Sequence, residues 1–438
     1  MTRDGVQAGT LPTTSESVGG QISLPFPRDR RRRAGSPVPE GRGHIIAGLF
    51  AGVGGLERGL HRAGHRTSLL CENDPVAIEV LRARFPDVPL HDDVCTLESV
   101  SAETSLIVAG FPCQDLSQAG STRGIAGARS GLVGEVFRLI ESHRTPWVLL
   151  ENVPFMLQLA CGEAMNVITS AFEEMGYAWA YRVVDTRAFG LPQRRRRVYF
   201  VASREGDPRS ILFADEASLA SEPIANGGSI ACGFYWTEGL RGLGWAVDAV
   251  PTLKGGSSIG IPSPPAILLP DGRIVTPHIR DAERLQGFPA GWTKPAERVA
   301  KAGLRWKLVG NAVSVPAAAW IGRRLRRPGR VLAFDVAPMR GHRHWPVAAW
   351  NVGEGRVRVE ASEWPVARRY KSLESFLAHD PSPLSAKATA GFLERANRAQ
   401  LRFQPGFIDA VTAHLNRMRP SASSHGIGFK NSETAQAA

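Results

Sequence analysis

The strongest constraint on the fold is the alternation of short apolar runs with amphipathic stretches between residues 45 and 203. The apolar runs predict buried strands at 45–50, 67–74, 105–112, 146–154 and 196–203. Between these runs, apolar residues recur with the period of a helix. Strands that alternate with helices favour a parallel sheet covered on both faces. We therefore predict an α/β fold with a doubly wound, mostly parallel, Rossmann-like sheet.

The pattern differs on both sides of this segment. Residues 1–42 are rich in Gly, Ser, Thr, Pro and Arg, which predicts a disordered basic arm. We assign 43–203 to a first domain and 204–270, rich in Gly, Pro and Ser, to a small irregular second domain. Helical patterns at 271–327 indicate a return to the first domain. Residues 328–438 form a C-terminal extension with predicted strands and a helix.

The net charge of +12 favours a polyanionic partner, of which nucleic acid is the simplest. The run Arg30–Arg33 can contact phosphate, although such runs are usually solvated tails. Five scattered cysteines without a CxxC pair argue against a zinc site and a disulfide framework, and they favour a reducing cytosol. Neither a membrane-spanning run of about 18 apolar residues nor a signal-peptide pattern is found, so we expect a cytoplasmic protein.

Polar groups follow the predicted strands, at the edge where doubly wound sheets bind ligands. Glycines in the loop FAGVGG (50–55) allow a sharp turn and the close approach of a ligand, although such loops also occur for tight packing alone. Glu72 can accept hydrogen bonds from ribose hydroxyls, and Asp93 can accept from an adenine amino group. Together they indicate an adenosine-containing cofactor, either a dinucleotide or S-adenosyl-L-methionine. The incomplete GxGxxG pattern counts against a dinucleotide.

Three further features at strand ends can carry chemistry. Cys113 follows a strand, where an exposed thiolate with positive neighbours is reactive, although a lone cysteine there is more often a buried filler. Glu151 ends the next strand and can donate a proton if burial raises its pKa, or it can be a capping or salt-bridged residue. In PQRRRRV (192–198), alternation sends Arg195 and Arg197 to one face. These arginines can clamp a phosphate or orient a base, or they can protect a sheet edge.

In this order the motifs resemble those of the C5-cytosine DNA methyltransferases of bacteria and phages. The resemblance covers roughly residues 45–326 and rests on LFAGVGGLERGL, ENDPVA, DDV, GFPCQDLS, SGLVGEVFRLI, ENV, QRRRRVYFV, RLQGFP and GNAVSVPAAAWI. Each motif alone is weak, but the Pro-Cys-Gln turn, ENV, the arginines and RLQGFP in sequence are specific. The resemblance implies that 43–203 is a catalytic and cofactor-binding domain and that 204–270 is a target-recognition domain.

The resemblance also assigns residues to functions. It makes Cys113 the nucleophile, places Glu151 on N3 and the amino group of the cytosine, and gives Arg195 and Arg197 contacts with the base and nearby phosphate. No metal is implied. The cofactor would be S-adenosyl-L-methionine, lined by Phe50, Ala51, Gly52, Gly54, Gly55, Glu72, Asn73, Asp93, Val94, Phe111, Asn311 and Val313. Asn73 stands where the family often has an aromatic residue that stacks on adenine, so stacking falls to Phe50.

The expected reaction is methyl transfer to C5 of a cytosine in a specific duplex DNA sequence. It proceeds through base flipping and a covalent bond from Cys113 to C6. We expect a monomer, either an orphan methylase or the modification partner of a restriction endonuclease that cuts the same site. Three alternatives stay open: a transfer RNA cytosine methyltransferase, a catalytically silent DNA-binding homologue, and a nicotinamide oxidoreductase. The absence of a Cys-Phe-Thr motif in the recognition region favours DNA over transfer RNA.

Overall fold

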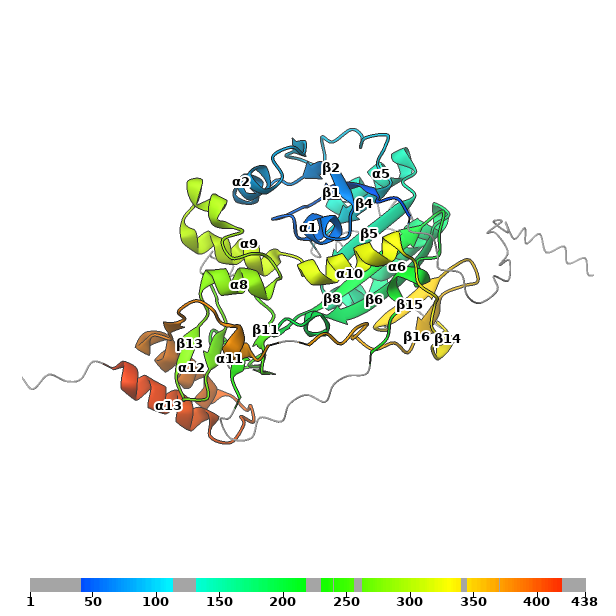
Figure 1. The fold of residues 1–438 in the computed structure, drawn as a ribbon. Helices are drawn as coiled ribbons and strands as arrows, with labels where there is room; N and C mark the ends of the chain where they lie inside the picture. Colours follow the sequence, from blue (N-terminus) through cyan, green and yellow to red (C-terminus); the bar gives the residue numbers. More distant parts are fainter. Residues whose placement is uncertain are drawn as a thin grey trace, which may run out of the picture. The chain divides into compact units, whose positions relative to one another are not determined.

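The main feature of the fold is a ten-stranded sheet ordered β14-β16-β15-β6-β8-β5-β4-β1-β2-β3 (Figure 1). The computed structural model describes residues 41–112, 131–217, 230–238, 240–255, 262–339, 345–369 and 371–419. The strands of this sheet are β1 (Ile45–Leu49), β2 (Arg66–Cys71), β3 (Leu90–His91), β4 (Leu106–Ala109), β5 (Trp147–Asn152), β6 (Ala178–Asp185), β8 (Arg196–Ser203), β14 (Val336–Pro338), β15 (Ala348–Asn351) and β16 (Val357–Val359). The predicted strands are all present, so the α/β class is confirmed.

The sheet is mixed rather than mostly parallel. The strands from β3 to β5 are parallel to one another. β8 lies antiparallel between β5 and β6, and β15, β16 and β14 continue the antiparallel pattern. Only residues 186–195 connect β6 to β8, and a parallel crossover needs about a dozen residues or more, usually with a helix. The strands β14, β15 and β16 belong to the C-terminal extension, so this extension forms one edge of the sheet.

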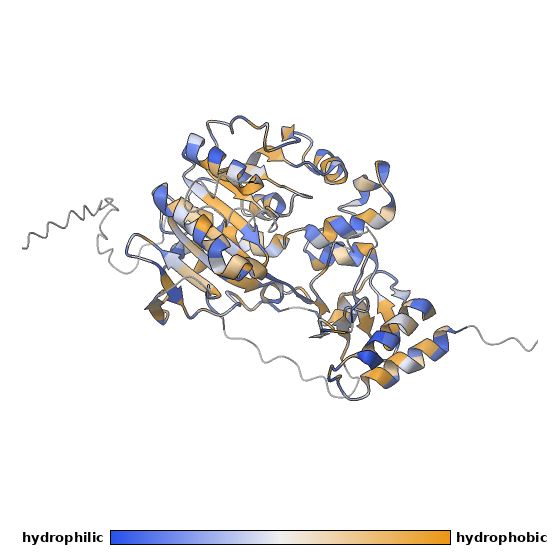
Figure 2. Ribbon diagram, turned by 180° about the vertical axis from the view of Figure 1, so that it is seen from behind, coloured by the Kyte–Doolittle hydropathy of each residue, from blue (hydrophilic) through white to orange (hydrophobic). Residues whose placement is uncertain are grey.

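Helices cover both faces of this sheet (Figure 1). One face packs against α1 (Gly55–His61), α7 (Arg209–Leu212) and α10 (Val315–Arg326), and the other against α5 (Leu132–His143) and α6 (Glu163–Glu174). Figure 2 shows the same pattern as apolar strands and two-toned helices. In the part of the chain that the structure describes, none of the helices is long and apolar enough to cross a membrane. The doubly wound arrangement is thus present.

Local sequence explains where these helices begin and which side they bury. α2 (Pro75–Arg84) starts with proline at its first position, and the Asp74 carboxylate caps it by accepting from the Val76 N–H at 2.9 Å. In α5, apolar residues at helical spacing, such as Val133, Val136 and Ile140, are fully buried against the sheet. The cap and the apolar stripe therefore fix these helices on the sheet.

A second, five-stranded sheet has the order β10-β9-β12-β13-β17. Its strands are β9 (Cys232–Phe234), β10 (Ala246–Val247), β12 (Ala266–Leu268), β13 (Ile274–Thr276) and β17 (Ser382–Pro383). Its core also takes side chains from α12 (Ala386–Arg398) and α13 (Phe407–Met418). The small sheet thus draws β13 and β17 from outside the predicted 204–270 range. Strands of two or three residues leave little pattern in the sequence, which is why these two were missed.

The remaining elements link the two sheets. β7 (Gln193–Arg194) pairs in parallel with β11 (Val250–Pro251). This pairing connects the segment just before β8 with the segment that follows β10 of the small sheet. The short helices here are α8 (Ile279–Leu285), α9 (Arg305–Asn311) and α11 (Leu373–Phe376). α8, α9 and α11 share an apolar cluster with residues of β11, β12 and β13. The division into domains stays a prediction.

Candidate active site

The carboxylate of Glu151 lies at the carboxyl end of β5, beside an arginine from the neighbouring strand. Its Oε1 is 3.1 Å from Nε of Arg197, and both side chains are nearly buried, at 9% and 10% exposure. Burial raises the pKa of Glu151, and the positive charges of Arg197 and Arg195 offset only part of that rise. Within the described residues the Oε1 atom makes no hydrogen bond of acceptable geometry. The carboxyl group can therefore hold a proton and present it to a ligand.

The turn that follows β4 is held against this carboxylate. The Asn152 side chain donates from Nδ2 to the backbone oxygen of Phe111 at 3.0 Å. A Cβ atom at Gly110 would lie 3.7 Å from Oε2 of Glu151, which is ordinary van der Waals contact. Residues 110–112 therefore lead the chain to the Glu151 carboxyl group. The predicted nucleophile Cys113 comes next and lies outside the described residues.

The four arginines at the start of β8 alternate as the sequence predicts. Arg195 and Arg197 are buried, whereas Arg194 and Arg196 are exposed. The Arg195 guanidinium donates to three backbone oxygens, those of Leu253 (3.3 Å), Gly310 (3.2 Å) and Ala312 (2.6 Å). Burial and the nearby charge of Arg197 lower the pKa of Arg195 to about 9. Its described contacts are with the protein's own backbone, so its predicted contact with base or phosphate stays a prediction.

Two buried residues beside these positions were not predicted from the sequence. Gln193 is fully buried, donates to the Leu285 backbone oxygen at 2.8 Å, and accepts from the Leu253 N–H at 3.0 Å. Tyr199 lies across from Glu151 in the β5–β8 register, and its buried hydroxyl has no hydrogen-bond partner among the described residues. Both residues belong to the motif QRRRRVYFV, so the glutamine and the tyrosine of this motif were the signal that could have identified them.

The glycine loop after β1 and the acid after β2 meet as predicted. The Glu72 carboxylate accepts from the Gly52 N–H at 2.7 Å and from the Asp74 N–H at 2.9 Å. Phe50 and Gly52 both have positive φ angles, 53° and 57°, so the loop turns sharply. A Cβ atom at Gly52 would meet nothing within 4 Å. The loop therefore leaves open space above its backbone, next to a half-buried carboxylate.

The other predicted cofactor residues lie around this loop or near the strand ends. A Cβ atom at Gly55 would be 2.9 Å from the backbone oxygen of Val313, so the start of α1 touches the segment after α9. Asp93 is half-buried and accepts from the Cys95 N–H at 2.9 Å. Ala51 is half-buried, Gly54, Val94 and Phe111 are buried, and Asn73 and Asn311 are exposed. No described contact joins Asn311 to the glycine loop.

This arrangement fits a cofactor that carries an adenosine group. Each Glu72 oxygen accepts one hydrogen bond and keeps a lone pair, so the carboxylate can accept two ribose hydroxyls. Burial raises the pKa of Glu72, and the backbone N–H groups of Asp74 and Gly52 offset part of this rise. The open space at Gly52 allows the ligand to approach the main chain.

Comparison with known proteins gives the family. The model of the family described as C-5 cytosine-specific DNA methylase matches residues 45–226. The chain is 48% identical over 379 residues to the Type II methyltransferase M2.BsuMI of Bacillus subtilis (strain 168), which covers 84% of this chain and 97% of that protein. It is 30% identical over 299 residues to the Type II methyltransferase M1.ScrFI of Lactococcus lactis subsp. cremoris, which covers 61% and 74%. The crystal structure of S. pombe Dnmt2 methyltransferase matches with 15% identity, covers 63% of this chain and 96% of that chain, and has a TM-score of 0.44.

The class of protein is therefore a methyltransferase of the α/β type. The match to M2.BsuMI extends over nearly the whole of that relative, well beyond the shared sheet. The chain belongs to the C-5 cytosine-specific DNA methylases, and it is a DNA cytosine-5 methyltransferase.

Proposed function

We propose that the enzyme takes its methyl group from S-adenosyl-L-methionine and that the loop 50–55 and Glu72 hold this cofactor. When bound, the cofactor supplies a methyl group activated by a positively charged sulfur. The Glu72 carboxylate fixes the ribose, and Asp93 lies near Cys71 at the end of β2, where it can accept from the adenine amino group. The open backbone at Gly52 supports this placement.

The nucleophile in this proposal is Cys113. Its thiolate attacks C6 of the target cytosine, and the ring becomes an enamine with electron density at C5. C5 would then take the methyl group as its bond to the sulfonium breaks and leaves a neutral thioether. A base such as a water molecule takes the C5 proton, and elimination restores the free thiolate and the C5–C6 double bond. Support comes from the turn 110–112, which brings the chain to the Glu151 carboxyl group one residue before Cys113.

Glu151 is the acid in this proposal, and its geometry carries the assignment. A protonated Glu151 donates to N3 of the cytosine and stabilises the negative charge that develops when the thiolate adds to C6. Its Oε1 atom is buried without a hydrogen bond among the described residues, and its pKa is raised by burial. The contact of Oε1 with Nε of Arg197, at 3.1 Å, fixes the orientation of the carboxyl group. Arg195 positions the surrounding backbone.

The substrate in this proposal is a specific sequence of double-stranded DNA. The target base leaves the stack to reach Cys113 and Glu151, at an unstacking cost of a few kcal/mol. The region 204–270, with the strands β9, β10 and β12, is the proposed target-recognition domain. The enzyme acts as a monomer in the cytoplasm of a bacterium, and a restriction endonuclease of the same specificity is its proposed partner. The names of the Type II relatives support this last point.

Labelled methyl transfer tests the proposal. Purified protein is incubated with methyl-labelled S-adenosyl-L-methionine and either bacterial genomic DNA or transfer RNA, and the labelled base is identified. We expect 5-methylcytosine in DNA alone. Cys113→Ser should abolish incorporation, and Glu151→Gln should lower it by about 100-fold or more, a typical cost of losing a general acid. Label in transfer RNA, or full activity of Cys113→Ser, would overturn the proposal.

A further inference from the structure

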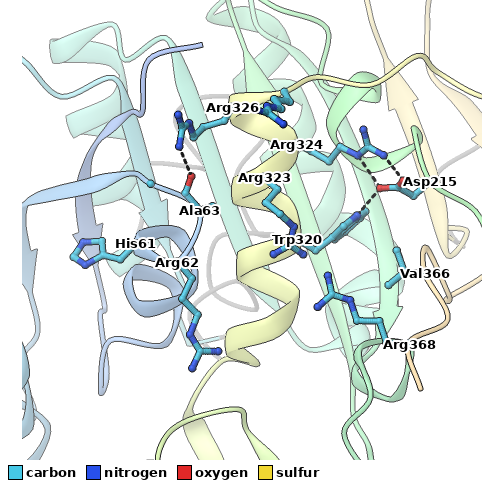
Figure 3. Close-up of a pocket in the computed structure, with 12 residues that line it drawn as sticks. His61, Arg62, Ala63, Asp215, Trp320, Arg323, Arg324, Arg326, Val366 and Arg368 are labelled. Carbon is cyan, nitrogen blue, oxygen red and sulfur yellow. Dashed lines mark hydrogen bonds and ion pairs between the residues drawn. The ribbon is translucent and has the colours of Figure 1, made fainter. Parts of the chain in front are cut away.

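A strongly basic pocket lies beside the C-terminal half of α10 (Figure 3). Its volume is about 660 Å³. It is formed by the end of α1, the end of α10 and a short stretch of the C-terminal extension. Its charged lining comprises one aspartate, Asp215, and six arginines, Arg62, Arg323, Arg324, Arg326, Arg327 and Arg368. The pocket thus carries a large excess of positive charge.

The one acid in the pocket is already neutralised. Arg324 pairs with both oxygens of Asp215, with 2.7 Å between Nε and Oδ2, and the Trp320 indole N–H donates to Oδ2 at 2.7 Å. Burial alone would raise the pKa of Asp215, but these hydrogen bonds hold it below its ordinary value. Asp215 is therefore charged, and its charge is already paired with Arg324.

Two of the arginines face each other without an acid between them. Arg323 comes from α10 and Arg368 from the C-terminal extension, and both are exposed. Among the described residues, neither side chain has a hydrogen bond or ion pair. Partial burial and the charge of Arg368 lower the pKa of Arg323. Such a like-charged pair is destabilising by itself and favours an anion that bridges the two guanidinium groups.

The pocket lies at the opposite end of the parallel strands from the cofactor loop. α1 begins at Gly55, directly after that loop, and the pocket is lined by His61 to Gly64 at its other end. β2 begins nearby at Arg66 and ends next to Glu72. A six-residue strand spans about 20 Å, so the pocket is separate from the site that receives the target cytosine.

We propose that this pocket binds the phosphate backbone of duplex DNA, on a stretch of the molecule other than the one that presents the target cytosine. The proposal rests on DNA being the substrate. Guanidinium groups match the geometry of phosphate oxygens, and closely spaced arginines suit a chain of phosphates. The Trp320 ring is 3% exposed, so it offers no face on which a base could stack. The contact is therefore independent of DNA sequence.

DNA binding as a function of length and salt tests this site. The double variant Arg323→Ala/Arg368→Ala is compared with a control of equal net charge, Arg82→Ala/Arg402→Ala, whose arginines are exposed and outside the pocket. Binding is measured by fluorescence anisotropy on random-sequence duplexes of about 15 and about 60 base pairs, lengths of about 50 and 200 Å. Thermal unfolding establishes that each variant is folded.

We expect the pocket variant to bind the long duplex about tenfold more weakly and to lower the salt slope by about two, because two phosphate contacts are lost. Its affinity for the short duplex should change less. On genomic DNA its KM for methylation should rise while kcat stays unchanged. The control variant should match the wild type in each of these measurements.

Three outcomes would overturn the proposal. One is an unchanged affinity for the long duplex in the pocket variant. Another is an equal loss in the control variant, which would reduce the effect to net charge. The third uses inorganic pyrophosphate as the probe. In this outcome pyrophosphate binds the wild type through Arg323 and Arg368, and long DNA does not displace it. That result would assign the pocket to a free anion.

Discussion

Arg195, which directly precedes β8, and Arg197 within β8 are both buried, yet their contacts differ. Arg197 contacts the Glu151 carboxylate, whereas Arg195, among the described residues, donates to three backbone oxygens from two separate segments. The alternation that points both inward was predictable from four consecutive arginines. The partners of Arg195 were not, because residues 253, 310 and 312 meet only in the folded chain.

This difference predicts that replacing Arg195 lowers the stability of the folded protein. Arg195→Met leaves three backbone oxygens without their donor, and each unsatisfied buried group costs about 1–3 kcal/mol. We therefore expect the free energy of unfolding to fall by at least about 3 kcal/mol, measured by urea denaturation. The matched control is Arg194→Met, since Arg194 is exposed and its guanidinium makes one hydrogen bond, to the Trp245 backbone oxygen at 3.0 Å. Equal stability of the two variants would contradict the structural assignment.

At the scale of elements, α1 carries a buried carboxyl group against β1. Glu57 is 1% exposed, and a Cβ atom at Gly48 of β1 would lie 2.1 Å from its Oε1. Neither carboxylate oxygen has a hydrogen bond from another described residue. Burial raises the pKa of Glu57 to about 7. The group is thus neutral in the folded protein at mildly acid pH.

Glu57 should therefore make stability depend on pH. The folded state binds this proton more tightly than the unfolded chain, whose pKa is 4.5. The contribution is full below pH 4.5 and is lost as the pH rises through about 7. Between pH 5 and pH 8 the free energy of unfolding of the wild type should fall by up to about 3 kcal/mol more than that of Glu57→Gln, at 1.36 kcal/mol per pKa unit. Parallel pH profiles in urea denaturation would refute this.

The contact between α1 and α10 predicts an intolerant glycine. A Cβ atom at Gly59 would lie 2.4 Å from the Ala318 Cβ and 2.7 Å from the Val315 backbone oxygen. Gly59→Ala should therefore lower stability by about 1–3 kcal/mol, as overpacking does. In α12 the same change at Gly391 meets only the Arg395 side-chain tip at 3.5 Å, so helix propensity should make it stabilising by about 0.5–1 kcal/mol. If thermal unfolding shows that both substitutions lower the melting temperature equally, the result would be inconsistent with this packing.

The sequence predicts most elements of 45–203, because apolar runs and helical periods repeat there, but it missed the strand β6. It did not reveal that β8 inserts between β5 and β6, since strand order depends on contacts between distant segments. At the site, motif order pointed to Glu151, Glu72 and the glycine loop, and their roles stay predictions. The hydrogen bonds of Gln193 lay outside that prediction because its partners are about 60 and 90 residues away.

At the scale of the whole molecule, the C-terminal extension completes both sheets. β14, β15 and β16 extend the large sheet beyond β6, and β17, α12 and α13 close the small one. Phe407 is 3% exposed and contacts the ring of Phe234 edge-on, with 5.1 Å between centroids. Residues from the last part of the chain thus build the core beneath the proposed recognition region.

This packing predicts separable effects on the two sheets. Phe407→Ala removes a buried ring at a cost of about 3–5 kcal/mol, so amide protection should fall in β9, β12 and β13 and DNA binding should weaken. Binding of S-adenosyl-L-methionine should persist, because its proposed residues lie at the carboxyl edge of the large sheet. The control is Phe403→Ala, a partly buried ring, which should have a smaller effect. An equal loss of amide protection in both sheets, measured by hydrogen exchange, would contradict this separation.

The most direct test of the central claim is to trap the covalent bond from Cys113 to cytosine. The enzyme is incubated with S-adenosyl-L-methionine and substrate DNA that contains 5-fluorocytosine, whose fluorine blocks the final elimination. Mass spectrometry then locates the attached residue. We predict one stable adduct at Cys113, lost in Cys113→Ser, and none at the buried Cys71 or Cys232. An active enzyme whose adduct maps to another residue, or that forms none, would contradict the account.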